Sequence, residues 1–124
     1  MGVIRAVRGA TTVADDQKTE IFTATIELMQ QIIERNSIEP EDMVSVIFTV
    51  TPDLTAAFPA AAVREMGICD VPLLDMAAPA VGGALQRCIR VLIHLHTDKE
   101  QVQHVYLREA ARLRPDLTQK GEIR

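Results

Sequence analysis

The sequence contains ten arginines but only three lysines, although its net charge is −4. Guanidinium groups are planar and weakly hydrated, so they suit bidentate binding of carboxylate or phosphate in partly buried sites. Arg90 is the most informative, because it interrupts an apolar run at residues 88–93. An unpaired charge there is costly, so an anionic ligand, a structural ion pair or exposure at a strand edge must satisfy it. Arg8, at the end of an apolar N-terminal run, presents the same problem in milder form.

Other reactive side chains are not arranged for hydrolysis or metal binding. Ser37 and Ser45 lie in no nucleophile elbow, and neither cysteine has a histidine beside it in the sequence. His94 and His96 share one face of a predicted strand, but a third metal ligand cannot be placed, which favours polar histidines that are hydrogen-bonded. Gly82-Gly83 is not followed by Lys-Ser/Thr and indicates a turn rather than a phosphate loop. The sequence therefore predicts no metal site.

Length and composition fit one globular domain. Of the 124 residues, 48% are apolar and 24% are charged, which is too apolar for a disordered chain. The overall acidity argues against nucleic-acid binding, and no apolar run reaches the roughly 18 residues of a membrane span. Arg5 and Arg8 interrupt any N-terminal signal core, so we expect a cytoplasmic protein. Cys69 and Cys88 are too few for a disulfide framework and are interpreted as buried free thiols.

The elements that would carry these side chains are short strands and two helices. Hydrophobic periodicity predicts strands at residues 4–7, 43–50, 71–74, 87–96 and 104–114, and helices at 17–36 and 58–66. Gly9 is expected to end the first strand, and Asp15 and Asp16 to cap the long helix. The apolar stripe of that helix is predicted from Phe22, Ile26, Met29 and Ile33, widened by Ile21, Leu28 and Ile32. A loop is expected at 77–83, and the strand at 104–114 is the most ambiguous element.

Seven segments in order along the chain carry a family resemblance. They are Val7-Arg8-Gly9-Ala10-Thr11-Thr12-Val13, Thr51-Pro52-Asp53-Leu54, Phe58-Pro59-Ala60, Val71-Pro72-Leu73, Cys88-Ile89-Arg90-Val91, His104-Val105-Tyr106-Leu107 and Leu113-Arg114-Pro115-Asp116-Leu117. Together they resemble chorismate mutases of the AroH type, and the match runs from about residue 4 to residue 117.

The resemblance implies an α+β fold, in which a mixed five-stranded sheet packs on one long and one short helix. It also implies a homotrimer with a pseudo-α/β-barrel core and active sites at the subunit interfaces. The domain would span 1–117, followed by a flexible tail at 118–124. The implied activity is the isomerisation of chorismate to prephenate by a pericyclic Claisen rearrangement in phenylalanine and tyrosine biosynthesis, with no cofactor.

The same resemblance implies the site. Arg90, Arg8 and Asp75 are the expected catalytic residues. The resemblance implies that Arg90 and Arg8 bind the substrate, while the role of Arg90 as the cation beside the breaking ether bond and the inclusion of Asp75 are our own expectations. The expected substrate-binding residues are Arg8, Phe58, Arg64, Leu73, Leu74, Asp75, Met76, Ala77, Ala78, Arg90, Tyr106, Leu113 and Arg114.

One position departs from the family pattern. Ala78 stands where family members usually carry a glutamate near the substrate ring, while Asp75 stands where they often carry cysteine or serine. We therefore expect Asp75 to supply the missing carboxylate from three residues earlier. The departure also leaves open a second interpretation, a trimeric small-molecule-binding protein without catalytic activity.

Overall fold

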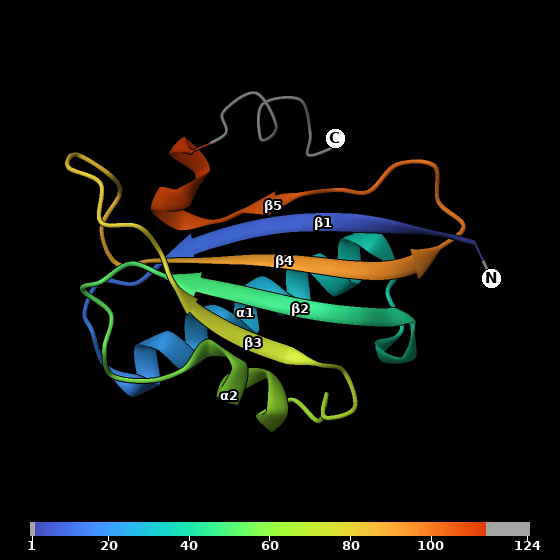
Figure 1. Cartoon of the computed structure of the whole chain (residues 1–124), viewed down its shortest axis with the longest axis horizontal. Helices are drawn as coiled ribbons and strands as arrows, with labels where there is room; N and C mark the ends of the chain where they lie inside the picture. The colour runs from blue at the N-terminus through green and yellow to red at the C-terminus, as the bar shows by residue number, and fades with distance from the viewer. Residues whose placement is uncertain (1, 114–124) are drawn as a thin grey trace.

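The structure, a computed structural model, describes residues 2–113. Within them the chain forms a five-stranded sheet in the order β3-β2-β4-β1-β5 (Figure 1). Its strands are β1 (Val3–Thr12), β2 (Met43–Val50), β3 (Leu73–Ala77), β4 (Cys88–Thr97) and β5 (Val105–Tyr106). The sheet is mixed, because β4 is antiparallel to β1 and β2, whereas β1–β5 and β2–β3 are parallel pairs. The predicted mixed five-stranded sheet is confirmed; the tail predicted at 118–124 lies outside the described residues.

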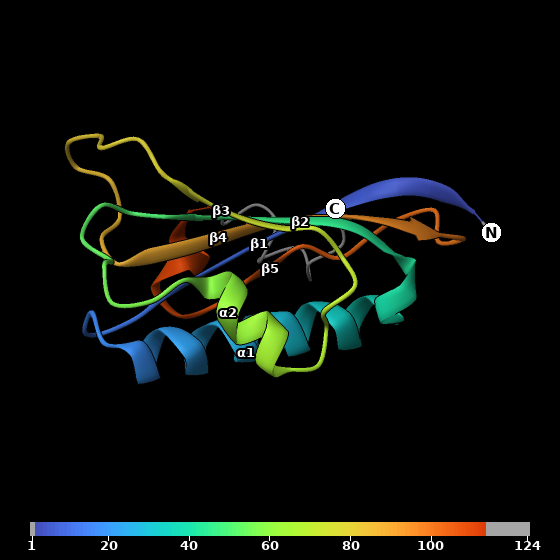
Figure 2. The same cartoon turned by 60° about the horizontal axis from the view of Figure 1, so that its bottom comes forward.

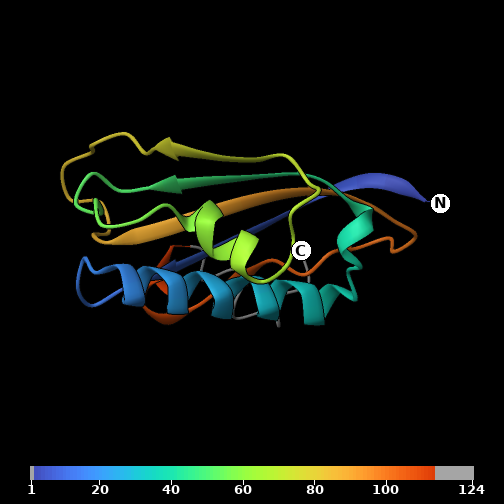
Figure 3. The ribbon, with the colours of Figure 1, turned by 90° about the horizontal axis from the view of Figure 1, so that it is seen from below.

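Both α-helices, α1 (Lys18–Asn36) and α2 (Pro59–Glu65), pack on one face of the sheet (Figure 2). Figure 3 shows α1 running beneath the strands. The core forms where α1 meets the side chains of alternate strand residues, among them Val7, Phe48 and Ile93, which are fully buried. The opposite face, here called the open face, carries neither α-helix, and Arg8, Arg90, Leu74 and Met76 are exposed on it. No helix among residues 2–113 has the length and apolar character needed to cross a membrane.

The long helix was predicted almost to the residue, but its buried face and its start differ from expectation. Phe22, Ile26 and Ile33 are only half-buried, and Ala24 and Thr25 complete the buried stripe instead. The helix has no side-chain cap at its first residue. The carboxylate of Asp16 turns away and accepts hydrogen bonds from the backbone N–H groups of Thr55 and Ala56 and from the Thr55 hydroxyl. Asp16 therefore ties the loop after β2 to the start of α1.

Two strand predictions are corrected at Gly9 and at the C-terminal segment. Gly9 lies inside β1, where a Cβ atom would stand 2.8 Å from Cδ1 of Ile32 and 3.0 Å from the backbone oxygen of Val105. Glycine is thus needed for close packing and does not end the strand. The strand predicted at 104–114 is wrong after residue 106, because a 3₁₀ helix, η2 (Arg108–Arg112), follows β5.

The turn from β5 into η2 is held by long-range contacts of Arg108. This residue adopts a φ of +54°, in the left-handed region that non-glycine residues seldom occupy. Its guanidinium donates to the backbone oxygen of Thr12 and lies 3.2 Å from the Glu27 carboxylate. No alternation pattern in the sequence reports such contacts, which is why the strand was predicted too long.

Candidate active site

Two rows of side chains cross the open face of the sheet. Residues in register on neighbouring strands point to the same face. The first row therefore consists of Tyr106, Ala10, Arg90, Thr49 and Met76, running from β5 to β3. The second row, one step of the pleat away, consists of Arg8, Leu92, Ile47 and Leu74. Residues nearly 100 positions apart in sequence thus become neighbours because the strand register is fixed.

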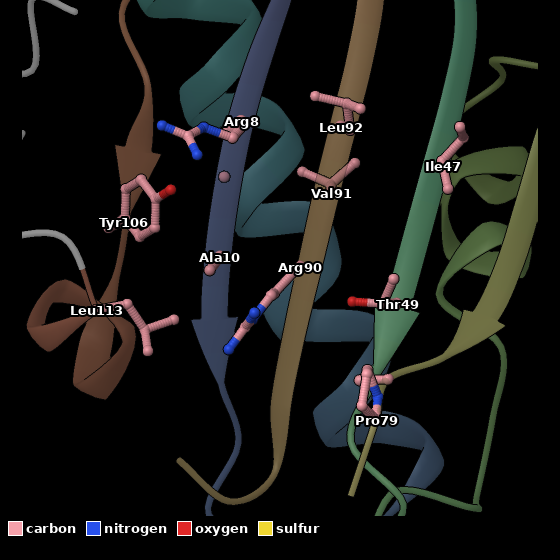
Figure 4. A pocket seen from close by; sticks show the side chains of 12 residues that line it. Arg8, Ala10, Ile47, Thr49, Pro79, Arg90, Val91, Leu92, Tyr106 and Leu113 are labelled. Carbon is pink, nitrogen blue, oxygen red and sulfur yellow. The ribbon is translucent and has the colours of Figure 1, made fainter. Parts of the chain in front are cut away.

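A cavity of about 570 Å³ lies over these rows. This volume falls within the roughly 300–1,000 Å³ typical of small-molecule sites. The residues lining it are Arg8, Gly9, Ala10, Ile47, Thr49, Ala78, Pro79, Arg90, Val91, Leu92, Tyr106 and Leu113. In Figure 4 the Arg90 side chain reaches from β4 towards β1, and Tyr106 and Leu113 face it from the β5 side.

The cavity is electropositive. Its lining contains two guanidinium groups and no carboxylate, and Arg8 and Arg90 are both exposed. The two salt bridges within residues 2–113 involve neither of them. Within residues 2–113 Arg90 therefore forms no ion pair, and its strand β4 lies between β2 and β1 rather than at an edge of the sheet. Its side chain is instead exposed on the open face. A ligand with two negative charges would supply the missing counter-charge.

The start of β4, two residues before Arg90, is fixed by the carboxylate of Asp53. Both carboxylate oxygens accept from the backbone N–H of Arg87, at 3.1 and 3.0 Å, and one accepts from the Thr51 hydroxyl at 2.6 Å. That hydroxyl oxygen in turn accepts from the backbone N–H of Cys88 at 2.9 Å. Arg87 itself has a φ of +48°. This network fixes the backbone from which Arg90 projects.

Cys88 is buried beside Arg90 and lies outside the lining of the cavity. Burial raises the pKa of its thiol, and the nearby Arg90 guanidinium only partly opposes this, so Cys88 remains protonated at neutral pH. The prediction of buried free thiols is confirmed for Cys88 and wrong for Cys69, which is free but exposed.

Comparisons with known proteins identify the family of the chain. A family model described as chorismate mutase type I matches residues 4–117. The chain belongs to this family. Chorismate mutase AroH of Thermus thermophilus is 51% identical over 118 residues, covering 93% of this chain and 97% of the relative. Chorismate mutase AroH of Bacillus subtilis (strain 168) is 47% identical over 119 residues, covering 94% of each chain.

A solved structure supports the same assignment. The structure of a chorismate mutase from Clostridium thermocellum superposes with a TM-score of 0.86 at 46% identity, covering 87% of this chain and 98% of the other. The reaction of the chain is the isomerisation of chorismate to prephenate, a step in aromatic amino acid biosynthesis. The interpretation as a binding protein without catalytic activity is not supported.

In this chorismate mutase, the expected site residues divide into two groups. Arg8, Arg90, Tyr106, Ala78 and Leu113 line the cavity. The other described ones lie at or near the β3 edge and outside the lining: Phe58, Arg64, Leu73, Leu74, Asp75, Met76 and Ala77. Arg114 lies outside the described residues.

Asp75 lies on the other face of the sheet from the cavity of its own chain. Asp75 is paired with Phe48, a core residue, so it faces the helices rather than the open face. One of its carboxylate oxygens accepts from the backbone N–H of Ala60 at 3.0 Å, in the first turn of α2. Burial raises its pKa, while the hydrogen bond from Ala60 and the charge of Arg64 act in the opposite direction. Within its own chain, Asp75 supports α2 and does not reach the cavity.

Sequence reasoning missed the part of the lining that strand register supplies: Gly9, Ala10, Ile47, Thr49, Pro79, Val91 and Leu92. Alternation from Arg8 and from Arg90 would have placed Ala10 and Leu92 on the open face. Ile47 and Thr49 could not be assigned in this way, because no residue pattern gives the register of β2 against β4. His94 also lies on this face, where its Nδ1 is 3.0 Å from the Ser45 hydroxyl. No group of three or more potential metal ligands occurs within residues 2–113.

Proposed function

We propose that chorismate is rearranged in the cavity on the open face of the sheet, with Arg90, Arg8 and Tyr106 as the groups that bind it. The observation that carries this proposal is the first cross-strand row, in which Arg90 and Tyr106 flank Ala10 on adjacent strands. Arg8 is one pleat away on the same face. Two cations and a phenol on rigid strands suit a dicarboxylate that must be held in one conformation.

The reaction requires only that the side chains position the substrate and stabilise the charge that develops on it. The rearrangement breaks a C–O bond and forms a C–C bond in one pericyclic step, without proton transfer or a covalent intermediate. Holding the side chain of the substrate folded over its ring lowers the entropic part of the barrier. A fixed cation beside the ether oxygen stabilises the negative charge that grows there. Arg90 takes this role, and Arg8 and Tyr106 hold the carboxylate and neighbouring oxygens against the apolar wall of Ile47 and Leu92.

The active enzyme is a homotrimer with its sites at subunit interfaces. The expected binding residues that do not line the cavity lie at the β3 edge and on α2, where Phe58, Leu74 and Met76 are 67%, 54% and 49% exposed. Such apolar exposure is typical of surfaces that another subunit covers. A neighbour that placed its β3 edge over the cavity would complete the site, and repetition of this contact around a three-fold axis closes a ring. Light scattering at micromolar concentration tests this assembly, which a monomer would contradict.

The reaction needs no metal or cofactor, because no hydride, electron or group is transferred. Exhaustive chelation should therefore leave the rate unchanged. The enzyme is cytoplasmic, which fits two cysteines that are not joined in a disulfide. Cell fractionation with antibody detection tests this location.

The decisive experiment follows the loss of the ultraviolet absorbance of chorismate for the wild type, Arg8→Ala and Arg90→Ala. Arg35→Ala is the matched control, because Arg35 is an exposed arginine in the last turn of α1. We expect both site variants to lose at least about 100-fold in kcat/KM, and the control to remain near the wild type. Near-normal activity in Arg8→Ala and Arg90→Ala would place the reaction elsewhere.

A further inference from the structure

A hydrogen bond joins His104 to Arg8, although His104 has no part in the proposed reaction. The backbone N–H of Arg8 donates to Nδ1 of His104, with 3.0 Å between the two nitrogens. The residues are 96 positions apart, and His104 immediately precedes β5. A side chain of the segment before β5 thus contacts the backbone of a residue that lines the cavity.

This hydrogen bond lies just before the point where the backbone pairing of β1 with β5 begins. The parallel pairing of β1 with β5 comprises two residue pairs, Gly9 with Val105 and Ala10 with Tyr106. Beyond Tyr106 the pairing is extended by the backbone N–H of Leu107, which donates to the oxygen of Ala10 at 2.9 Å. At the other end, the His104 side chain takes up the Arg8 N–H. The backbone of Arg8 is therefore held from the β5 side by an imidazole.

The backbone that precedes His104 is held in place by the end of α1. Gln103 is bound at both backbone groups by the Asn36 side chain, its N–H at 2.7 Å and its oxygen at 2.9 Å. Asn36 is 2% exposed at the end of α1 and also donates to the backbone oxygen of Ile32. This connection fixes the backbone next to His104 against a rigid helix.

The bond also sets the protonation state of His104. A backbone N–H can only donate, so Nδ1 must carry its lone pair and the imidazole must be neutral. Protonation would place a second N–H against that of Arg8 and break the bond. The segments next to His104 in the chain and in the sheet, together with the end of α1, carry charged or titratable groups. They are Arg5 and Arg8 on β1, Asp98, Lys99 and Glu100 between β4 and β5, Tyr106 on β5, and Glu34 and Arg35 on α1.

We propose that His104 is a positioning residue, whose neutral imidazole holds the backbone of Arg8 and so directs its guanidinium into the cavity. This inference rests on the proposed function, because it gives Arg8 the task of binding a carboxylate. Such a contact exists in the bound substrate and in the transition state alike. Loss of the hydrogen bond should therefore raise KM more than it lowers kcat.

The test compares His104→Asn with His104→Leu. Asparagine places its Oδ1 at the same number of bonds from the backbone as Nδ1 of histidine, so it keeps an acceptor that does not take up a proton. Leucine is similar in size and has no acceptor. We expect His104→Leu to lose about tenfold in kcat/KM, which corresponds to roughly 1.4 kcal/mol, mainly through KM. His104→Asn should remain within about twofold to threefold of the wild type at neutral pH.

The pH dependence of kcat/KM gives a second test, because a purely structural role of His104 would not change it. Once the pH is low enough for the imidazole to take up a proton, kcat/KM of the wild type should decline. This decline should be absent or shifted to lower pH in His104→Asn. Equal profiles for the two proteins, or equal activity of the Leu and Asn variants, would overturn the proposal.

Two further measurements separate this inference from the proposed function and from misfolding. Arg8→Ala should be severely impaired, and an active Arg8→Ala variant would refute the proposed site. If Arg8→Ala is inactive but both His104 variants have normal activity, only the role of His104 is refuted. In the wild type, a ¹⁵N–¹⁵N scalar coupling between the Arg8 amide and Nδ1 of His104 should be observed by NMR. Its absence at neutral pH would refute the bond without any variant.

Discussion

Asp75 is the residue at which sequence and structure lead to different experimental outcomes. A carboxylate beside the substrate would make Asp75→Asn a catalytic defect with unchanged stability. The structure instead has Asp75 on the helix side, accepting from the N–H of Ala60 in the first turn of α2. We therefore predict that Asp75→Asn leaves kcat nearly unchanged and that Asp75→Ala is a stability defect.

The magnitudes follow from what each substitution removes. Asparagine keeps an oxygen that accepts from Ala60, and it removes a charge that burial disfavours, so the free energy of unfolding should change by less than about 0.5 kcal/mol. Alanine leaves the Ala60 N–H without its acceptor, as in loss of a helix N-cap, which costs about 1 kcal/mol.

The pH dependence has a definite sign. Burial raises the pKa of Asp75 above the usual 3.8, so the folded chain binds this proton more tightly than the unfolded chain. The wild type should therefore gain stability relative to Asp75→Asn as the pH falls through the raised pKa of the folded state and approaches that of the unfolded chain.

The assay combines urea unfolding of each variant, at fixed subunit concentration, with chorismate turnover at pH 7. Asp75→Asn should match the wild type in kcat, and Asp75→Ala should unfold at lower urea while its kcat changes little below the transition. A loss of 100-fold or more in kcat for Asp75→Asn, with an unchanged unfolding midpoint, would refute this reasoning. It would show that the carboxylate acts on the substrate.

Three further predictions concern the residues that fix the cavity. Arg90→Ala should lose about 3–4 kcal/mol of transition-state stabilisation, mostly in kcat. Arg90→Lys should also be severely impaired, because the point charge of an ammonium replaces the planar guanidinium with its several N–H donors. A near-normal kcat in the lysine variant would contradict this prediction. Asn36→Ala removes hydrogen bonds to both backbone groups of Gln103 and should lower the free energy of unfolding by about 2–3 kcal/mol, measured by urea unfolding. Gly9→Ala would bring a Cβ atom to 3.0 Å from the backbone oxygen of Val105, so it should cost about 1–3 kcal/mol and displace β5, seen as a raised KM.

The sequence predicted those elements whose ends carry strong local signals. Residues 43–50 were predicted as a strand without error, because a polar turn precedes them and Thr51-Pro52-Asp53 follows. Alternation also placed Arg8 on the same face of its strand as Ile4, which is the open face. Local patterns were sufficient for both limits of β2, which residues that break a strand enclose, and for the face of Arg8, but not for the end of β1.

The alternation of side chains along β3 explains the direction of Asp75, which the sequence left open. The third strand was predicted at residues 71–74, so Asp75 followed the strand end and its direction was free. The observed strand is Leu73–Ala77, and because successive side chains alternate, Asp75 must face opposite to Leu74 and Met76. A boundary shift of a few residues therefore directs this carboxylate towards α2 of its own chain.

The β5 edge shows why other parts of the site lie beyond local sequence patterns. A strand of two residues is too short to be stable by its own pairing, yet β5 carries Tyr106 to the cavity. It is held instead by long-range contacts: Asn36 to Gln103 before it, His104 to Arg8 beside it, and Arg108 to Thr12 and Glu27 after it. Each contact joins residues more than 60 positions apart, so no periodic pattern in the sequence indicates it. Because these contacts fix the β5 side of the cavity while the Asp53 network fixes the start of β4, the positions of Tyr106 and Arg90 depend on tertiary hydrogen bonds more than on strand propensity.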